Sequence, residues 1–197
     1  AMSSFPQKWV EDPATLPCRH PRIAFRDVAR ATDSRTIIAS LIPPGVIPTE
    51  KAPYLLFSEG GDRAEAFLLG IMASLPFDWV SRRVIETGVK FYLLNALPVP
   101  SPGCSNLKKR VIKIAGHLAA VDNRYGEWAN SVGVPVGSVR ANKKQELIAE
   151  LDAAVARLYE LTEEEVIHIF ETFHEGWDHK PRLKRVLKHF RQLPSDN

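Results

Sequence analysis

The chain is poor in cysteine and has no long apolar run. Cys18 and Cys104 are the only cysteines in 197 residues, which is too few for a disulfide framework. No apolar stretch approaches the roughly 18–20 residues that span a bilayer. The first four residues, Ala-Met-Ser-Ser, lack the basic-then-apolar order of a signal peptide. We therefore expect a cytoplasmic protein with no membrane segment.

Familiar catalytic motifs are also missing. An amino-methyltransferase needs an (Asn/Asp)-Pro-Pro-aromatic loop to hold an extruded base, and the nearest match is Ile-Pro-Pro-Gly at 42–45. The chain has no Glu-x-Lys nuclease motif, no phosphate-binding or dinucleotide fingerprint and no Gly-x-Ser-x-Gly elbow. The spacing of His168, His174, Asp178 and His179 matches no standard zinc site. We expect no catalytic residues, no metal and no cofactor in this chain.

Composition predicts a folded protein whose positive charge is concentrated in a few stretches of the chain. With 45% apolar residues, the chain can form one core, or one core plus a helical appendage. The net charge is only +3, but it is unevenly spread. Residues 19–35 carry five arginines against two aspartates, whereas 107–113 and 182–191 carry four and five basic residues with no acid. A solvated face explains any one such run, but three together favour a polyanionic partner.

Changes in composition and in the spacing of apolar residues divide the chain into four segments. Four prolines and little periodicity predict an extended lead-in over 1–21. Mixed strand-like and helix-like patterns predict an α+β domain over 22–102, and helical periodicity predicts a helical segment over 103–175. A basic tail occupies 176–197.

The 22–102 segment should form a mixed sheet with two helices. Alternation and β-branched residues predict an antiparallel hairpin, with turn chemistry at 32–34 between its strands. Asp62 and Glu65 form a capping-box pattern for a helix that ends before Pro76, and a short helix follows. The Gly-Gly pair at 60–61 favours a plain helix-entry turn over a phosphate site. The predicted strands cover residues 22–28, 35–42, 53–58 and 89–94.

The 103–175 segment should form a helical hairpin or bundle. Apolar residues step by four and three over 107–121, the seam of a helix that packs lengthwise on another. Its natural partner is the apolar stripe over 147–158, reached through a Gly-containing connection at 124–139. A third helix should begin at Thr162, with Glu165 completing its capping box.

Three runs resemble one known family, in family order. RIAFRDVARATDSRTIIASLIPP at 22–44 is similar to the opening of the C-terminal target-recognition (specificity) domain of type IIG and type ISP restriction–modification adenine DNA methyltransferases. LLNALPVP at 93–100 resembles the close of that domain. ELIAELDAAVARLY at 146–159, followed by 161–173, resembles its terminal helices. The resemblance implies a target-recognition fold that binds a short site in double-stranded DNA.

The resemblance also implies where the chemistry lies. The bacterial methyltransferase or endonuclease domains would act in cis or in trans, and S-adenosylmethionine would bind in that methyltransferase domain rather than in this chain. The basic run at 182–191 has no counterpart that we recognise. Base-contacting residues vary with the DNA site, so the resemblance assigns none of them.

Arginine and lysine chemistry supplies the DNA-binding candidates. Arginine donates two parallel hydrogen bonds to guanine, and either cation neutralises phosphate. An equal alternative is that Arg22 or Arg35 pairs with Asp27 or Asp33. Trp79 could wedge a base step, although a core aromatic is the stronger expectation. The candidates are Arg26, Arg30, Arg35, Arg82, Arg83 and Lys90 in the α+β domain, with Lys108, Lys109 and Arg110 as phosphate contacts.

Two other functions remain open from the sequence. In the first, the chain is a protein-interaction module whose 107–121 seam and acidic 146–165 helix dock a methyltransferase or nuclease subunit. Salt separates this hypothesis from DNA binding, because phosphate contacts weaken steeply with salt and an apolar interface does not. The second is a standalone enzyme of unknown type, which a turnover assay would reveal.

Overall fold

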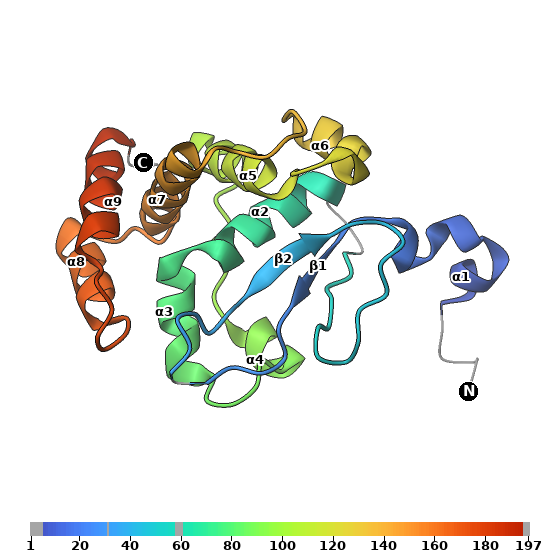
Figure 1. Ribbon diagram of the computed structural model, residues 1–197, viewed down its shortest axis with the longest axis horizontal. Coiled ribbons are helices and arrows are strands. Elements are labelled where there is room, and N and C mark those ends of the chain that lie inside the picture. Colours follow the sequence, from blue (N-terminus) through green and yellow to red (C-terminus); the bar gives the residue numbers. More distant parts are fainter. Residues whose placement is uncertain (1–5, 31, 58–60, 195–197) are drawn as a thin grey trace.

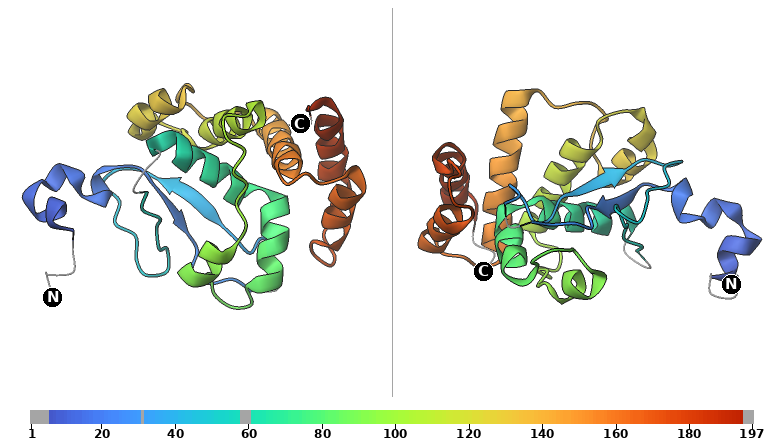
Figure 2. Two further views of the ribbon diagram at one scale, coloured as in Figure 1. Left: turned by 180° about the vertical axis from the view of Figure 1, so that it is seen from behind. Right: turned by 60° about the horizontal axis from the view of Figure 1, so that its bottom comes forward.

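The computed structural model describes residues 6–30, 32–57 and 61–194, and it is an α+β fold dominated by helices. Strands β1 (Arg22–Phe25) and β2 (Ala39–Ile42) pair antiparallel. Figure 1 shows α2 (Gly61–Ala73) alongside this hairpin, with α5 (Asn106–Ala119) and α7 (Ala141–Leu158) beyond it. The two ends of the molecule are formed by α1 (Gln7–Glu11) and by the pair α8 (Glu163–Thr172) and α9 (Lys180–Gln192), as both views of Figure 2 confirm.

The predicted hairpin is confirmed, although its strands are shorter than the alternation suggested. All four residues of β1 are buried, because its outer edge is covered by the segment that follows β2. The amide of Phe25 donates to the Pro53 carbonyl at 2.9 Å, and the amide of Leu55 donates to the Ile23 carbonyl at 2.9 Å. The predicted strand at 53–58 is therefore reduced to one isolated bridge. Its last residue, like Gly60 of the helix-entry turn, lies outside the described residues.

The predicted strand at 89–94 is wrong. This segment forms helix α4 (Phe91–Ala96) instead. The sequence FYLLNA has no β-branched residue, and a short apolar run does not distinguish a buried strand from a helix. This region meets the extension of β1 through an isolated bridge between Val28 and Gly88 and through the Val89 amide, which donates to the Asp27 carbonyl at 2.7 Å. In the described part of the chain the sheet is therefore antiparallel and two-stranded, not mixed.

Helix signals along the chain were more reliable. The capping box of Thr162 and Glu165 is present at the start of α8, and α5 packs on α7 as the seam predicted. Helix α3 (Leu75–Val84) begins earlier than expected, because Ser74 caps it and a proline is tolerated in the first turn. The predicted connection at 124–139 contains a 3-10 turn, Asn123–Tyr125, and helix α6 (Gly126–Val132).

The chain's two ends also carry more helix than the sequence suggested. The lead-in contains α1 and the 3-10 turns Pro13–Thr15 and Pro17–Arg19. The basic tail folds as α9, with Val186 and Phe190 buried on its inner side. Dense positive charge hid this helix, because only a narrow apolar stripe marks it.

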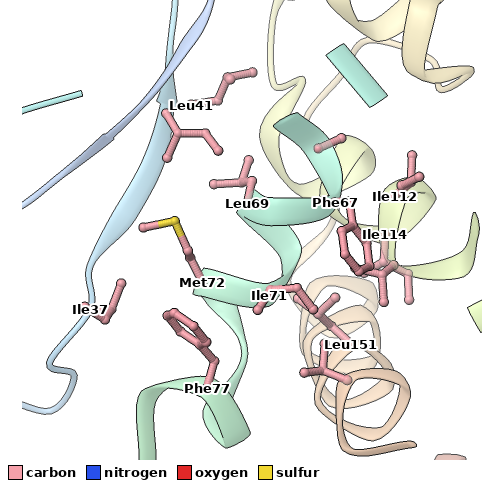
Figure 3. Close-up of a cluster of buried hydrophobic side chains, with 14 of the residues drawn as sticks. Ile37, Leu41, Phe67, Leu69, Ile71, Met72, Phe77, Ile112, Ile114 and Leu151 are labelled. Carbon is pink, nitrogen blue, oxygen red and sulfur yellow. The ribbon is translucent and has the colours of Figure 1, made fainter. Parts of the chain in front are cut away.

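One apolar cluster joins the hairpin to the helical segment. Figure 3 shows Ile37 and Leu41 from the hairpin side facing α2, whose opposite side meets Ile114 of α5 and Leu151 of α7. A Cβ at Gly70 would lie 2.6 Å from Val111 Cγ1, so glycine lets α2 and α5 approach closely here. The α+β and helical segments therefore share a core. A second cluster lies between α7, α8 and α9.

Glu65 does not cap α2 as its spacing predicted. Its carboxylate is buried and accepts hydrogen bonds from the Ile23 amide at 3.2 Å and the Trp128 Nε1 at 2.8 Å. Asp62, the other half of the pattern, accepts a bond from Ser131 Oγ at 2.6 Å. Glu65 therefore ties the hairpin, α2 and α6 together, and its burial raises the pKa of its carboxyl group to about 7.

This raised pKa predicts that Glu65 weakens the fold as pH rises. Between pH 4.5 and 7 the folded protein keeps a proton that the unfolded chain has lost, so raising the pH favours unfolding. We expect the free energy of unfolding of the native chain, relative to Glu65→Gln, to fall by at most about 3 kcal/mol between pH 5 and pH 8. Urea titrations at both pH values measure it. If Glu65→Gln loses as much stability between the two pH values as the native chain does, or if the exposed control Glu127→Gln removes the same loss, this account is wrong.

Candidate nucleic-acid interface

Three of the predicted arginines form hydrogen bonds to one residue, Asp33. Arg26 Nη2 lies 2.5 Å from Asp33 Oδ2, the Arg30 amide donates to the same oxygen at 3.0 Å, and Arg82 Nη2 donates to the Asp33 carbonyl at 2.6 Å. Desolvation opposes ionisation of Asp33, but the Arg30 amide and the Arg26 guanidinium outweigh it and lower its pKa. Arg26 and Arg30 place two positive charges near this one carboxylate, an excess of one. We call these four residues the Asp33 cluster.

The Asp33 cluster is held between α3 and the segment after α8. Arg26 directly follows β1, whereas Arg82 lies in the last turn of α3 with its guanidinium 4.6 Å from the ring centroid of Phe173. His174 Nε2 lies 3.3 Å from the Thr32 carbonyl oxygen, next to Asp33. A hollow of about 240 Å³ opens beside this contact. The loop that carries Arg30 is thus clamped from both sides, while the Arg30 side chain itself is exposed.

Arg83 extends the positive surface along α3. Its guanidinium lies 3.3 Å from the ring centroid of Trp79, and its Nη1 donates to the Trp79 carbonyl at 3.2 Å. Trp79 Nε1 in turn donates to Thr172 Oγ1 of α8 at 2.9 Å. Trp79 therefore packs between α3 and α8, and Arg83 is exposed above it.

Arg35 has a structural role instead. Its Nε lies 2.6 Å from Asp78 Oδ2, and its Nη1 and Nη2 donate to the carbonyls of Ala73 and Ser74 at 3.0 Å each. These bonds satisfy carbonyls at the end of α2. Neither expected pairing with Asp27 or Asp33 occurs for Arg22 or Arg35: Arg22 donates to backbone carbonyls. Because its donors are occupied inside the protein, Arg35 is not part of the candidate interface.

Lys90 forms part of a second cationic group. Its Nζ donates to Asp27 Oδ1 at 2.9 Å, and Lys51 Nζ lies 3.9 Å from Asp27 Oδ2. The hydrogen bond from Lys90 lowers the pKa of Asp27. Both lysine side chains are more than half exposed. Two cations again share one carboxylate, so this group also carries an excess of positive charge.

The three basic residues at the start of α5 are not joined to the Asp33 cluster by any contact between described residues. Lys108 Nζ lies 5.4 Å from the ring centroid of Phe67, and Arg110 pairs with the buried Glu150 of α7. Lys109 is exposed and has no ion pair within the described ranges. Of these three, Lys109 is the one best placed for a phosphate.

The apolar seam that the interaction-module hypothesis proposed as a docking surface is largely buried inside the fold. The seam at 107–121 packs against the chain's own helices, which bury Leu107, Val111 and Ile114. Among its seam residues Val121 alone is exposed, with 41% of its surface accessible. A separate apolar hollow of about 280 Å³ lies between α4 and the segment at 55–57. That hollow carries no cation, so it does not extend the positive surfaces.

The sequence missed the residues that organise this region. Asp78 is fully buried and fixes Arg35 from 43 positions away, a separation that leaves no local pattern. Within the described residues, no group of three His, Cys, Asp or Glu side chains could hold a metal ion. The same part of the chain contains no helix long and apolar enough to cross a bilayer.

Comparison with known proteins found no match: no family model, curated protein or solved structure matches the chain. Its function is therefore inferred from its own residues. The chemistry that these residues offer is binding of anions at positively charged surfaces, with Arg30 and Arg83 the most available guanidinium groups near the Asp33 cluster.

The contrast between Arg35 and Arg30 can be tested by stability. Arg35→Gln leaves the buried Asp78 without its cation and should lower the free energy of unfolding by about 3 kcal/mol or more. Arg30→Gln removes an exposed side chain and should leave the urea midpoint nearly unchanged. The double variant Arg35→Gln/Asp78→Asn should recover part of the loss. Equal midpoints for the two single variants would show that Arg35 is not a structural residue.

Proposed function

We propose that this chain is the DNA-target-recognition part of a bacterial restriction–modification adenine methyltransferase and is not catalytic by itself. The carrying observation is the Asp33 cluster, in which the Arg26 guanidinium pairs with the Asp33 carboxylate and the Arg30 side chain is exposed beside it on a clamped loop. A surplus of guanidinium groups on a rigid surface suits phosphate and guanine. Double-stranded DNA is the partner that this chemistry favours.

The sequence resemblance supports the specific class. The run at 22–44 carries Arg26, Arg30 and Asp33, so three of the four members of the Asp33 cluster lie in the segment that resembles target-recognition domains. Under this proposal, methyltransferase or endonuclease domains in cis or in trans supply S-adenosylmethionine and the catalytic loop. This chain supplies binding energy and the choice of DNA site.

The surrounding geometry suggests a division of labour. Arg26 and Arg82 are tied to Asp33 and hold the loop, whereas Arg30 and Arg83 have exposed side chains that can reach DNA. Lys90 would position phosphate, since a lysine contributes affinity without selecting a base. Base discrimination should therefore come from arginines near Asp33.

Salt-dependent DNA binding tests this proposal directly. We expect the full chain to bind random duplex DNA in fluorescence anisotropy, with an affinity that falls steeply between ~50 and ~300 mM salt. On random duplex DNA, which offers no matched site, we expect Arg30 and Arg83 to contact phosphate, so Arg30→Gln/Arg83→Gln should reduce the slope of log affinity against log salt by about 2, at about 0.9 for each lost contact. The matched control Lys8→Gln/Arg19→Gln removes two charges near α1, at the other end of the molecule, and should leave the slope unchanged.

Two results would contradict the proposal. Binding that is absent at the lowest salt, or that does not respond to salt, would favour a protein-docking role over DNA recognition. Methylation or cleavage of DNA by the isolated chain would show that it is an enzyme in its own right.

A further inference from the structure

The outer side of α9 carries cations that the protein does not neutralise. Lys184, Arg185 and Lys188 lie one helical turn or less apart, and we call them the α9 face. None of the three has an ion pair with a described residue. Lys184 and Lys188 are exposed, and Arg185 is half-buried with no hydrogen-bond partner for its buried Nε. Positive charge is therefore concentrated on one side of this helix.

Arg182, His189 and Arg191 of α9 each lie against an acid of a neighbouring helix, whereas Lys180 at its start has no ion pair among the described residues. Arg182 Nη2 lies 2.7 Å from Asp152 of α7, and Arg191 Nη2 lies 2.5 Å from Glu163 of α8. His189 Nε2 lies 3.1 Å from Glu146 of α7. Pairing is thus systematic where α9 meets α7 and α8, and it stops at the α9 face.

This arrangement is unfavourable without an anion. Like charges four residues apart, as in Lys184 and Lys188, repel each other and destabilise a helix. A buried guanidinium nitrogen without an acceptor adds a further cost. The α9 face also borders a broad hollow that includes Pro181 and Gln192, where Glu146, already in contact with His189, is the one carboxylate among the lining residues described. An external anion would offset the repulsion between the two exposed lysines.

We propose that the α9 face is a second phosphate-contact surface for double-stranded DNA, distinct from the Asp33 cluster. This inference rests on the proposed function, because that function supplies the polyanion. From Lys184 to Lys188 the helix rises about 6 Å, and one DNA strand carries a phosphate per about 3.4 Å of axis. About two phosphates therefore fit along the α9 face, and they add affinity without selecting a sequence.

The position of α9 makes joint contact with one duplex feasible. The segment between α8 and α9 touches the loop of the Asp33 cluster through His174 and Thr32, at 3.3 Å. Helix α9 begins at Lys180, directly after that segment. Figure 1 shows α8 and α9 together at one end of the molecule, beyond α3 and α7. A duplex bound at the Asp33 cluster would thus run close to the start of α9.

Matched double variants of the full chain test the α9 face. We expect Lys184→Gln/Lys188→Gln to lower the salt slope of duplex binding by about 2, and to weaken binding to every duplex sequence by the same factor. Lys8→Gln/Arg19→Gln removes the same charge near α1 and should have no such effect. Unchanged urea midpoints for both variants would establish that folding is intact.

The outcomes separate this inference from the proposed function. An unchanged slope for Lys184→Gln/Lys188→Gln, with a reduced slope for Arg30→Gln/Arg83→Gln, overturns the α9 proposal alone. The reverse pattern supports the α9 face and rejects the Asp33 cluster as the DNA contact. An equal loss in the α1 control shows a general charge effect and overturns the α9 proposal. Absence of DNA binding by the native chain rejects both.

Discussion

A buried carboxylate must be paired or the fold loses several kcal/mol, and two fully buried aspartates impose this constraint around the first turn of α3. Asp78, in that turn, accepts the Ile37 amide at 2.6 Å and binds Arg35. Asp152 of α7 accepts the Leu75 amide at 2.8 Å and pairs with Arg182. The start of α3 therefore links the hairpin, α7 and α9 through charges that cannot be left unpaired.

These two pairs also set the orientation of both positive surfaces. Arg35 fixes the segment between Asp33 and β2, so the loop of the Asp33 cluster is held in place in the free protein. Arg182 fixes the rotation of α9 about its axis and, together with buried Val186 and Phe190, turns Lys184 and Lys188 outward. Rigid placement of charged side chains lowers the entropy lost on binding. The same buried ion pairs that stabilise the fold thus also orient the charged side chains on its surface.

Sequence patterns predicted those parts of the structure that depend on neighbours along the chain. The seam of α5 and the capping box of α8 were recognisable because both signals repeat within a few residues. The predictions for the segment at 89–94 and for Glu65 were wrong. A short apolar run fits a helix as well as a strand, and Glu65 bonds Ile23, 42 positions away. The candidate site shows the same distinction between local patterns and contacts between remote residues. Arginine type and spacing predicted Arg30, but Asp78, remote in sequence, decides that Arg35 is internal.

Two modest positive surfaces on one rigid body can bind more tightly than either alone. Under the proposed function each would place only a few cations on a duplex, and contacts of this kind weaken quickly with salt. When both surfaces belong to one folded unit, contact at the first brings the second to the DNA at high effective concentration, with no flexible linker to order. The Asp33 cluster and α9 meet this condition, because α3 and the segment at 173–179 connect them. Sequence choice near Asp33 and uniform affinity from α9 would then be separable properties of the same chain.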